Sequence, residues 1–288
     1  MTAVSTTDTA LTWDVLVTPG IPMVTGNPPP GTTQMLWSPI SSTLITGQRD
    51  AILVDAFLTI AQAESLADWV TARGKNLTTI YITHGHADHF FGLGTLLAQF
   101  PRAMAVATPS VVQLMRQQAS PAVLGPRWEA RFPGQVPRQP TIAEEFTGNV
   151  LELEGRELVI VPVGHTDTDN TTCLHVPSLG LVVAGDVAYN DVHQHLGESN
   201  AKTRQEWIAA LDTIEALNPR AVVAGHKRPG TDNGPGIIET TRQYIRDFDR
   251  IFETTSTARE LYDAMLACYP TRVNRGILWL SALAVRPS

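Results

Sequence analysis

Short apolar runs alternate with amphipathic segments in the first part of the chain. Runs of four residues that are rich in β-branched or aliphatic side chains are typical of buried strands. Between two of them, Thr59 and Gln62 have the spacing of a helix capping box, and Leu66, Trp69 and Val70 recur on one helical face. This strand–helix–strand rhythm predicts an α/β architecture. The predicted strands cover residues 51–54, 79–82 and 104–107.

Residues 11–54 alternate loops rich in proline and glycine with short apolar runs, which predicts strands and hairpins. The loop 27–31 (Asn-Pro-Pro-Pro-Gly) lies between Met23 and Trp37. We expect this loop to be either a mobile flap near a functional site or an ordinary exposed turn.

Residues 108–149 interrupt the alternation. Pro109 opens a short predicted helix through Met115, and five further prolines follow within a segment that contains Trp128. We interpret 108–149 as an insertion that either lines a substrate pocket or pads the scaffold.

Apolar runs resume after the insertion, and several of them end just before a polar residue. His165, Asp186 and His226 each follow such a run, so the strands should bring them to one edge of a sheet. Thr203 and Glu206 predict the start of a helix between the last two runs. The predicted strands cover 150–153, 158–161, 172–176, 181–183 and 221–224.

From residue 236 the chain has helical spacing, and Thr257 and Glu260 predict the start of a second helix there. We therefore divide the chain into a main domain, 1–235, and a C-terminal helical extension, 236–288, packed on the same domain.

The composition is that of a globular protein: 288 residues, of which 43% are hydrophobic and 17% charged. A formal net charge of −7 argues against nucleic acid as a partner. The N-terminus lacks the features of a signal peptide, and no stretch approaches the roughly 18 apolar residues of a membrane span. We expect a cytoplasmic protein with no membrane partner. Cys173 and Cys268 lie far apart, and we expect both to be small buried hydrophobic residues.

Residues 83–89 (Thr-His-Gly-His-Ala-Asp-His) concentrate three imidazoles and a carboxylate between a predicted strand and a predicted helix. Imidazole nitrogen and carboxylate oxygen are the usual non-sulfur ligands of zinc and similar divalent ions. A solvated turn that happens to be rich in histidine is the alternative, although the whole chain has only 8 histidines. The spacing favours a metal site.

Five polar motifs follow one another along the chain: Asp55, the cluster His84-x-His86-x-Asp88-His89, Gly164-His165, Gly185-Asp186 and Gly225-His226. Their order resembles that of the metallo-β-lactamase fold superfamily over residues 35–230. The resemblance implies an αββα sandwich, in which two mixed sheets are flanked by helices and the site lies at one sheet edge. It implies two metal ions, zinc first, with iron or manganese as alternatives.

The resemblance also implies a role for each of these residues. His84, His86 and His165 match the ligands of the first metal, and Asp88, His89 and His226 match those of the second. Asp186 matches a carboxylate that bridges the two ions. Asp55 matches an acid that orients a ligand imidazole.

Two dications would hold a bridging water whose pKa falls towards neutrality, so the implied reaction is attack of hydroxide on an ester-like carbonyl. Asp88 is then both a ligand and a candidate proton shuttle. Tyr189 resembles a tyrosine of the acyl-homoserine-lactone lactonase branch and could donate a hydrogen bond to the substrate, which makes a lactone the first candidate. This chain has Asp186 and no cysteine at this motif, which differs from the best-known zinc β-lactamases.

Four further residues are candidate substrate contacts: Trp37, Trp128, His193 and His195. For the two histidines, a polar loop without contact to substrate is the favoured alternative. Other functions stay open: hydrolysis of a β-lactam or thioester, an iron-dependent oxidoreductase of the same superfamily, or a metal-binding scaffold without activity. The expected partner is a small-molecule substrate, and a homo-oligomer is an open alternative.

Overall fold

Two mixed β-sheets pack face to face in this computed structural model, which describes residues 10–286. Apolar side chains from both sheets, such as Ile52, Tyr81, Leu174 and Val183, form a buried layer between them. The first sheet has the order β1 (Thr12–Thr18), β4 (Ile40–Thr46), β5 (Asp50–Val54), β6 (Asn76–Tyr81), β7 (Met104–Ala107) and β8 (Glu144–Glu145). The second has the order β13 (Ala221–Lys227), β12 (Leu181–Asn190), β11 (Thr171–Val176), β10 (Arg156–Gly164) and β9 (Val150–Leu153).

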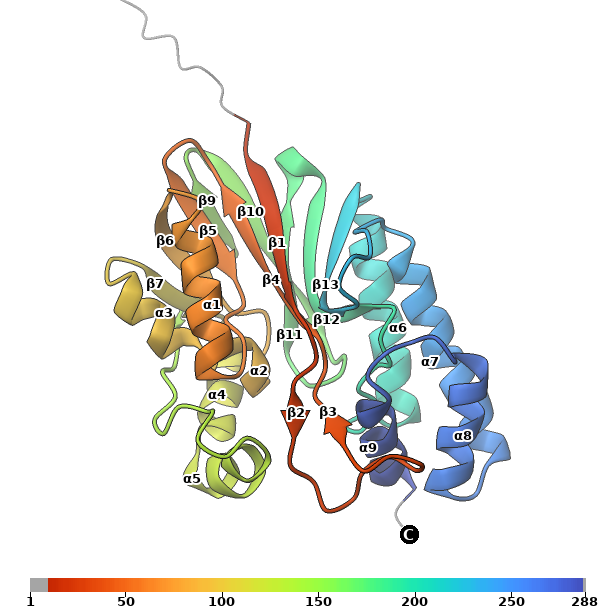
Figure 1. Cartoon of the computed structure of the whole chain (residues 1–288). Helices are drawn as coiled ribbons and strands as arrows, with labels where there is room; N and C mark the ends of the chain where they lie inside the picture. Colours follow the sequence, from red (N-terminus) through yellow and green to blue (C-terminus); the bar gives the residue numbers. More distant parts are fainter. Residues whose placement is uncertain (1–9, 287–288) are drawn as a thin grey trace, which may run out of the picture.

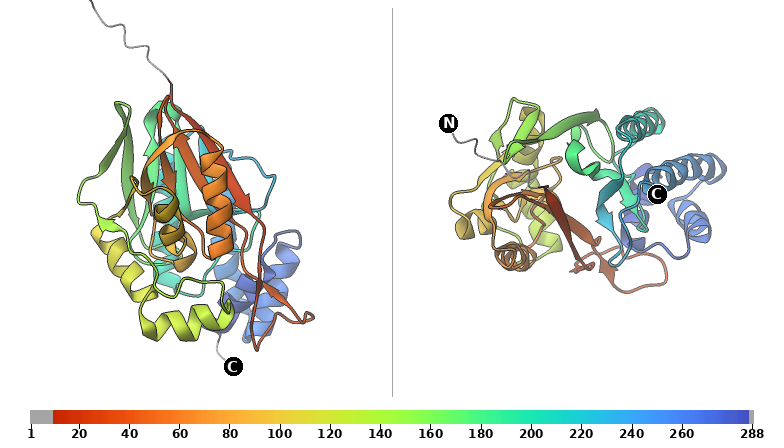
Figure 2. Two further views of the ribbon diagram at one scale, coloured as in Figure 1. Left: turned by 60° about the vertical axis from the view of Figure 1, so that its left-hand side comes forward. Right: turned by 90° about the horizontal axis from the view of Figure 1, so that it is seen from above.

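Helices cover the outer faces of both sheets, as the predicted αββα sandwich requires (Figure 1). Seen from above, the two groups of helices lie on opposite sides of the strands (Figure 2). On one side are α1 (Ile60–Thr71), α2 (Ala87–Phe90), α3 (Leu93–Gln99), α4 (Pro109–Gln118) and α5 (Pro121–Val123). On the other are α6 (Ala201–Ala216), α7 (Ile237–Thr254), α8 (Ala258–Cys268) and α9 (Arg275–Val285). The predicted fold class is confirmed.

Helix starts show how far local sequence signals determine these elements. Helix α1 begins after Thr59, whose side chain accepts a hydrogen bond from the Gln62 amide in a complete capping box. Helix α8 likewise begins after Thr257, as predicted. The predicted start of α6 was wrong by three residues, because Asn200 caps that helix and Thr203 completes its capping box. Asparagine is at least as strong an N-cap as threonine.

The segment 108–149 is folded and not mere padding. It contains α4, α5 and the π-helix η1 (Leu124–Glu129), and its end forms β8, which pairs in parallel with β7. Trp128 in η1 is buried.

The C-terminal helices pack on the second sheet, and α9 also meets a short ribbon formed by β2 (Pro22–Met23) and β3 (Met35–Leu36). A Cβ atom on Gly276 of α9 would lie 2.8 Å from the Met35 side chain. In Figure 1 this ribbon and α9 lie at the same end of the sandwich as α4 and α5. The division at residue 235 stays a prediction.

Two further expectations concern burial. Cys173 is buried as expected, but Cys268 is exposed at the end of α8, so the prediction for Cys268 was wrong. Among residues 10–286, no helix combines the length and apolar character that crossing a membrane would need.

Candidate metal centre

Histidine and aspartate side chains from both sheets meet at one end of the sandwich. The turn after β6 and helix α2 supply the cluster 84–89, β12 supplies Asp186, and β13 supplies His226. Within residues 10–286 the ligand atoms form two compact groups, each with its atoms within 4.8 Å of one another. One group is His84, His86, Asp167 and Asp186, and the other is Asp88, His89 and His226.

Asp186 connects the two groups. Its Oδ1 lies 3.3 Å from His89 Nε2, and its Oδ2 lies 3.2 Å from His226 Nε2. Asp88 Oδ2 is 3.4 Å from the same His226 nitrogen. Two atoms bound tetrahedrally at about 2.0–2.1 Å from one zinc-like ion lie about 3.3 Å apart, so these separations fit shared metal coordination.

Several of these atoms are buried without a hydrogen bond to any described residue. They include His84 Nε2, His89 Nε2 and Asp186 Oδ1. Because unpaired buried polar atoms are costly, this arrangement fits a site whose polar atoms bind a divalent ion. Burial, and then the neighbouring His89, lower the pKa of His84 to about 4, which keeps its imidazole in the neutral form that binds metal.

Hydrogen bonds behind the imidazoles direct their other nitrogens towards the centre. Asp55, in a left-handed conformation at φ 65°, accepts from His89 Nδ1 at 2.8 Å and from the Thr83 amide at 3.0 Å. His226 Nδ1 donates to the Pro39 carbonyl at 2.8 Å, which leaves its Nε2 free. The geometry of Asp55 is thus that of an orienting acid.

Gly225 makes room for this packing. A Cβ atom at this position would lie 2.3 Å from Asp186 Oδ1 and 3.0 Å from the His89 ring. The glycine before His226 is therefore required by the close approach of the two ligand groups.

A pocket leads to the centre. Trp37, Trp128 and Ile277 form its apolar walls, while His195 and Tyr189 also line it. The walls come from the segment before β4, the insertion and α9. The Asn27–Gly31 loop does not line this pocket, so the structure gives no support to the flap alternative.

Two pocket residues bond directly to the aspartates. Trp37 Nε1 donates to Asp88 Oδ2 at 2.9 Å, and the Tyr189 hydroxyl donates to Asp186 Oδ2 at 2.7 Å. Burial, together with the charge of Asp186, raises the pKa of Tyr189 well above its usual value, so the hydroxyl stays protonated.

Two of the predicted residues lie outside the two compact ligand groups. Among residues 10–286, His165 joins neither ligand group. Its Nδ1 lies 2.7 Å from Asp169 Oδ1, and its Nε2 is buried without a hydrogen bond to any described residue. His193 lies in a loop, is fully buried 2.9 Å from the Tyr244 hydroxyl, and does not line the pocket, which agrees with the alternative of a loop residue without contact to substrate.

Other residues of the site had not been predicted. Asp167 lies two residues after His165, and Asp169 follows it in the same loop. These two acids were a signal for a further ligand, but the resemblance directed attention to His165 alone. Glu198, whose Oε2 is 3.5 Å from His86 Nε2, and the pocket residues Arg127 and Asn274 lie in segments with no local pattern.

A buried His/Asp centre at the edge of a two-sheet α/β sandwich defines a class of proteins suited to binding divalent metal. The family model of the metallo-beta-lactamase superfamily matches residues 35–226, and the chain belongs to that superfamily.

Known proteins agree with this assignment. A metallo-beta-lactamase type 2 from Bacteroides fragilis is 24% identical over 222 residues, which cover 76% of this chain and 78% of the relative. A hydroxyacylglutathione hydrolase from Synechococcus sp. (strain CC9902) is 27% identical over 210 residues, covering 68% and 72%. A solved metallo-beta-lactamase family protein from Thermus thermophilus shares the fold, with a TM-score of 0.65, 18% identity and coverage of 94% and 92%.

Proposed function

We propose that the protein is a metal-dependent hydrolase that cleaves an ester-like carbonyl compound, with a lactone as the first candidate. The observation that carries the proposal is the pocket whose floor combines both ligand groups with the Tyr189 hydroxyl. Two divalent ions bound there, zinc being the first candidate, would polarise a carbonyl oxygen and lower the pKa of a bound water.

Asp88 suits the role of a ligand. Burial alone would raise its pKa, but a hydrogen bond with His226 and the nearby charge of His89 hold the pKa well below the usual range. Asp88 therefore stays ionised. Since a carboxylate with so low a pKa is a weak base, a role as proton shuttle would need a proton acceptor of higher pKa to take the proton onward.

Tyr189 suits the role of a hydrogen-bond donor to the reacting carbonyl. Its ring stacks on His226, with centroids 5.6 Å apart, and its hydroxyl lies beside Asp186. Because a hydroxyl carries one proton, Tyr189 would have to release Asp186 when substrate binds, and its hydroxyl would then stabilise negative charge that develops on a substrate oxygen.

The pocket walls support a small substrate with oxygen acceptors. Arg127 Nε, His195 Nδ1 and Asn274 Nδ2 are buried nitrogens without a hydrogen bond to any described residue. A ring or acyl group could pack on Trp37 and Trp128, whose rings meet edge to face at 5.5 Å. The relatives are named for a β-lactam and for hydroxyacylglutathione, so both compound classes belong in the assay beside lactones and simple esters.

The test is hydrolysis of lactones, esters, thioesters and β-lactams by metal-loaded protein and by Tyr189→Phe. We expect Tyr189→Phe to lower kcat by up to about 100-fold with little change in KM, because the lost interaction strengthens only as charge develops. Its metal content should equal that of the wild type. Tyr244→Phe, which changes a buried tyrosine that does not line the pocket, is the control and should keep its kcat. Absence of hydrolysis on the whole panel would contradict the proposal, and unchanged kinetics of Tyr189→Phe would remove the tyrosine from it.

A further inference from the structure

The segment 37–39, between β3 and β4, holds two of the three residues in the second ligand group. The Trp37 indole donates from Nε1 to Asp88 Oδ2 at 2.9 Å, and the Pro39 carbonyl accepts from His226 Nδ1 at 2.8 Å. Asp88 Oδ2 and His226 Nε2 then lie 3.4 Å apart. One short segment of the chain therefore controls how these two side chains face each other.

The Trp37 side chain is itself held firmly. Its ring meets those of Trp128 and Phe132 edge to face, with centroids 5.5 Å and 5.9 Å apart. Its backbone amide donates to the Ile21 carbonyl at 2.7 Å. Because an indole has a single N–H group, which lies in the plane of the ring, a fixed ring gives the hydrogen bond a fixed direction. Trp37 and Asp88 are both buried, so water competes little for this bond.

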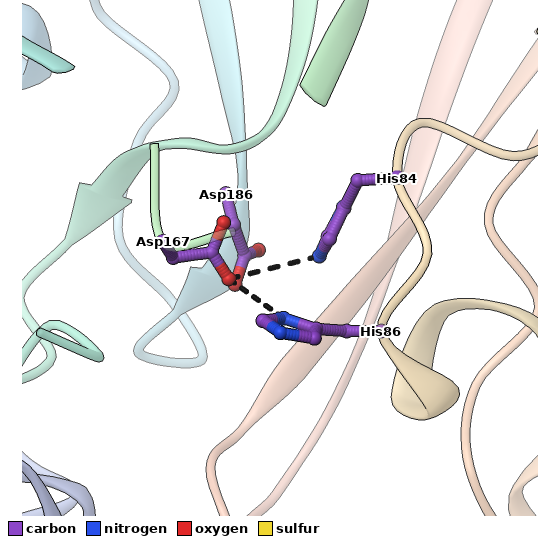
Figure 3. A group of neighbouring side chains, drawn as sticks. All are labelled: His84, His86, Asp167 and Asp186. Carbon is purple, nitrogen blue, oxygen red and sulfur yellow. Dashed lines mark ion pairs between the residues drawn. The ribbon is translucent and has the colours of Figure 1, made fainter. Parts of the chain in front are cut away.

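The aspartates of the first ligand group show a different arrangement. Figure 3 shows Asp167 and Asp186 facing the two imidazoles of that group. Asp186 accepts a hydrogen bond of 2.7 Å from the Tyr189 hydroxyl. A hydroxyl hydrogen rotates about its C–O bond, so this donor can turn to another acceptor. The indole N–H of Trp37 has no such freedom, which suits it to hold a ligand in one orientation.

We propose that Trp37 is a positioning residue for the second metal ion, because its indole N–H holds the Asp88 carboxylate in the orientation that binds the ion. A carboxylate oxygen has lone pairs for both a hydrogen bond and an ion, so Asp88 can accept this bond and still be a ligand. Loss of a partner that orients a ligand typically weakens metal binding by about 10- to 100-fold. The inference rests on the metal site of the proposed function but not on hydrolysis.

The first test is Trp37→Phe, which removes the N–H group and keeps an aromatic ring in the pocket wall. We expect one of two ions per chain to bind about 10- to 100-fold more weakly, and the visible spectrum of the Co²⁺ form to change. Titration with Zn²⁺ against a chromophoric chelator measures both affinities. Circular dichroism of the metal-free protein verifies that the variant has folded.

Trp128→Phe is the matched control. It also removes an indole from the pocket wall, but the Trp128 N–H donates to Gln118 Oε1 at 3.0 Å and not to a member of either ligand group. Both Zn²⁺ affinities and the Co²⁺ spectrum of this variant should equal those of the wild type.

A second test uses the wild type and decides alone if Trp37→Phe does not fold. The indole N–H signals of ¹⁵N-labelled protein are followed by NMR during addition of Zn²⁺, and the Trp37 signal is identified by its proximity to the Trp128 and Phe132 rings. This signal should shift as the second ion binds, because the ion draws charge from the carboxylate that accepts the bond. The signals of Trp13 and Trp69, which do not line the pocket, should stay in place.

The outcomes separate this inference from the proposed function. If Trp37→Phe binds both ions with wild-type affinity and spectrum, or if the Trp37 signal does not move while two ions bind, the inference is overturned. A wild type that binds fewer than two ions overturns it as well. A wild type that binds two ions but hydrolyses none of the compounds contradicts the proposed function alone.

Discussion

His193 is a titratable side chain that has no exposed surface. Its Nδ1 meets the Tyr244 hydroxyl at 2.9 Å, and its Nε2 is buried without a hydrogen bond to any described residue. Burial, and then the charges of Arg272 and Arg275, lower the pKa of His193 to about 3. The folded protein therefore holds this imidazole neutral throughout the physiological range.

This burial predicts a pH-dependent stability. Between about pH 6.5 and pH 3 the unfolded chain binds a proton at His193 that the folded chain does not, so the stabilising contribution is complete above pH 6.5 and is lost as the pH falls. From pH 7 to pH 5 the loss amounts to about 2 kcal/mol. In His193→Asn the free energy of unfolding should fall by about that much less over the same interval. Urea unfolding of both metal-free proteins at the two pH values measures the difference, and parallel curves would contradict the assignment.

At the scale of elements, α9 is part of the pocket and not an appendage. Asn274 caps α9 and lines the pocket together with Ile277, while Gly276 lies against β3. Trp37, which follows β3 directly, forms the opposite apolar wall. The spacing of α9 from β3 thus determines the shape of the site.

A methyl group at position 276 should disturb that spacing. In Gly276→Ala the new Cβ would lie 2.8 Å from the Met35 side chain and 3.0 Å from the Leu36 carbonyl oxygen, so the Met35 side chain must repack and α9 must shift slightly from β3. We expect a loss of about 1–3 kcal/mol in the free energy of unfolding, as for overpacked sites. Gly125→Ala, whose new Cβ would meet no described atom within 4 Å beyond its chain neighbours and the backbone of its own helix, is the matched control and should be neutral or slightly stabilising. Equal stability of the two variants in urea unfolding would contradict the tight packing of α9.

Features that depend on a few neighbouring residues could be predicted from the sequence, and features that depend on packing could not. Capping boxes such as Thr59/Gln62 and the cluster 84–89 are local, so a few residues determine both the element and its chemistry. The pocket residues Arg127 and Asn274 were not predictable, because they meet only after separate segments pack together. Asp167 was missed for another reason: it lies in the loop after β10, two residues past the histidine that the resemblance marks.

At the scale of the whole molecule, the candidate metal-binding residues come from both sheets. The cluster 84–89 follows β6 of the first sheet, whereas Asp186 and His226 belong to β12 and β13 of the second. Asp88, Asp167 and Asp186 are buried together where the two sheets meet. Without a cation their negative charges would repel one another, and only the neighbouring imidazoles would offset them. A bound ion should therefore stabilise the packing of one sheet on the other.

Removal of metal should lower the thermal stability and loosen both sheets at this edge. A ligand present at about 1,000 times its Kd stabilises the folded state by about 4 kcal/mol per ion, which corresponds to a rise in Tm of about 10 °C. Calorimetry of chelator-treated protein before and after addition of Zn²⁺ or Mn²⁺ measures this shift. Hydrogen exchange then locates it: on metal removal, exchange should rise both in residues 83–90 and at the ends of β12 and β13. Because the ligands on either sheet alone could hold an ion only weakly, a change confined to one sheet, or an unchanged Tm, would contradict a centre that joins them.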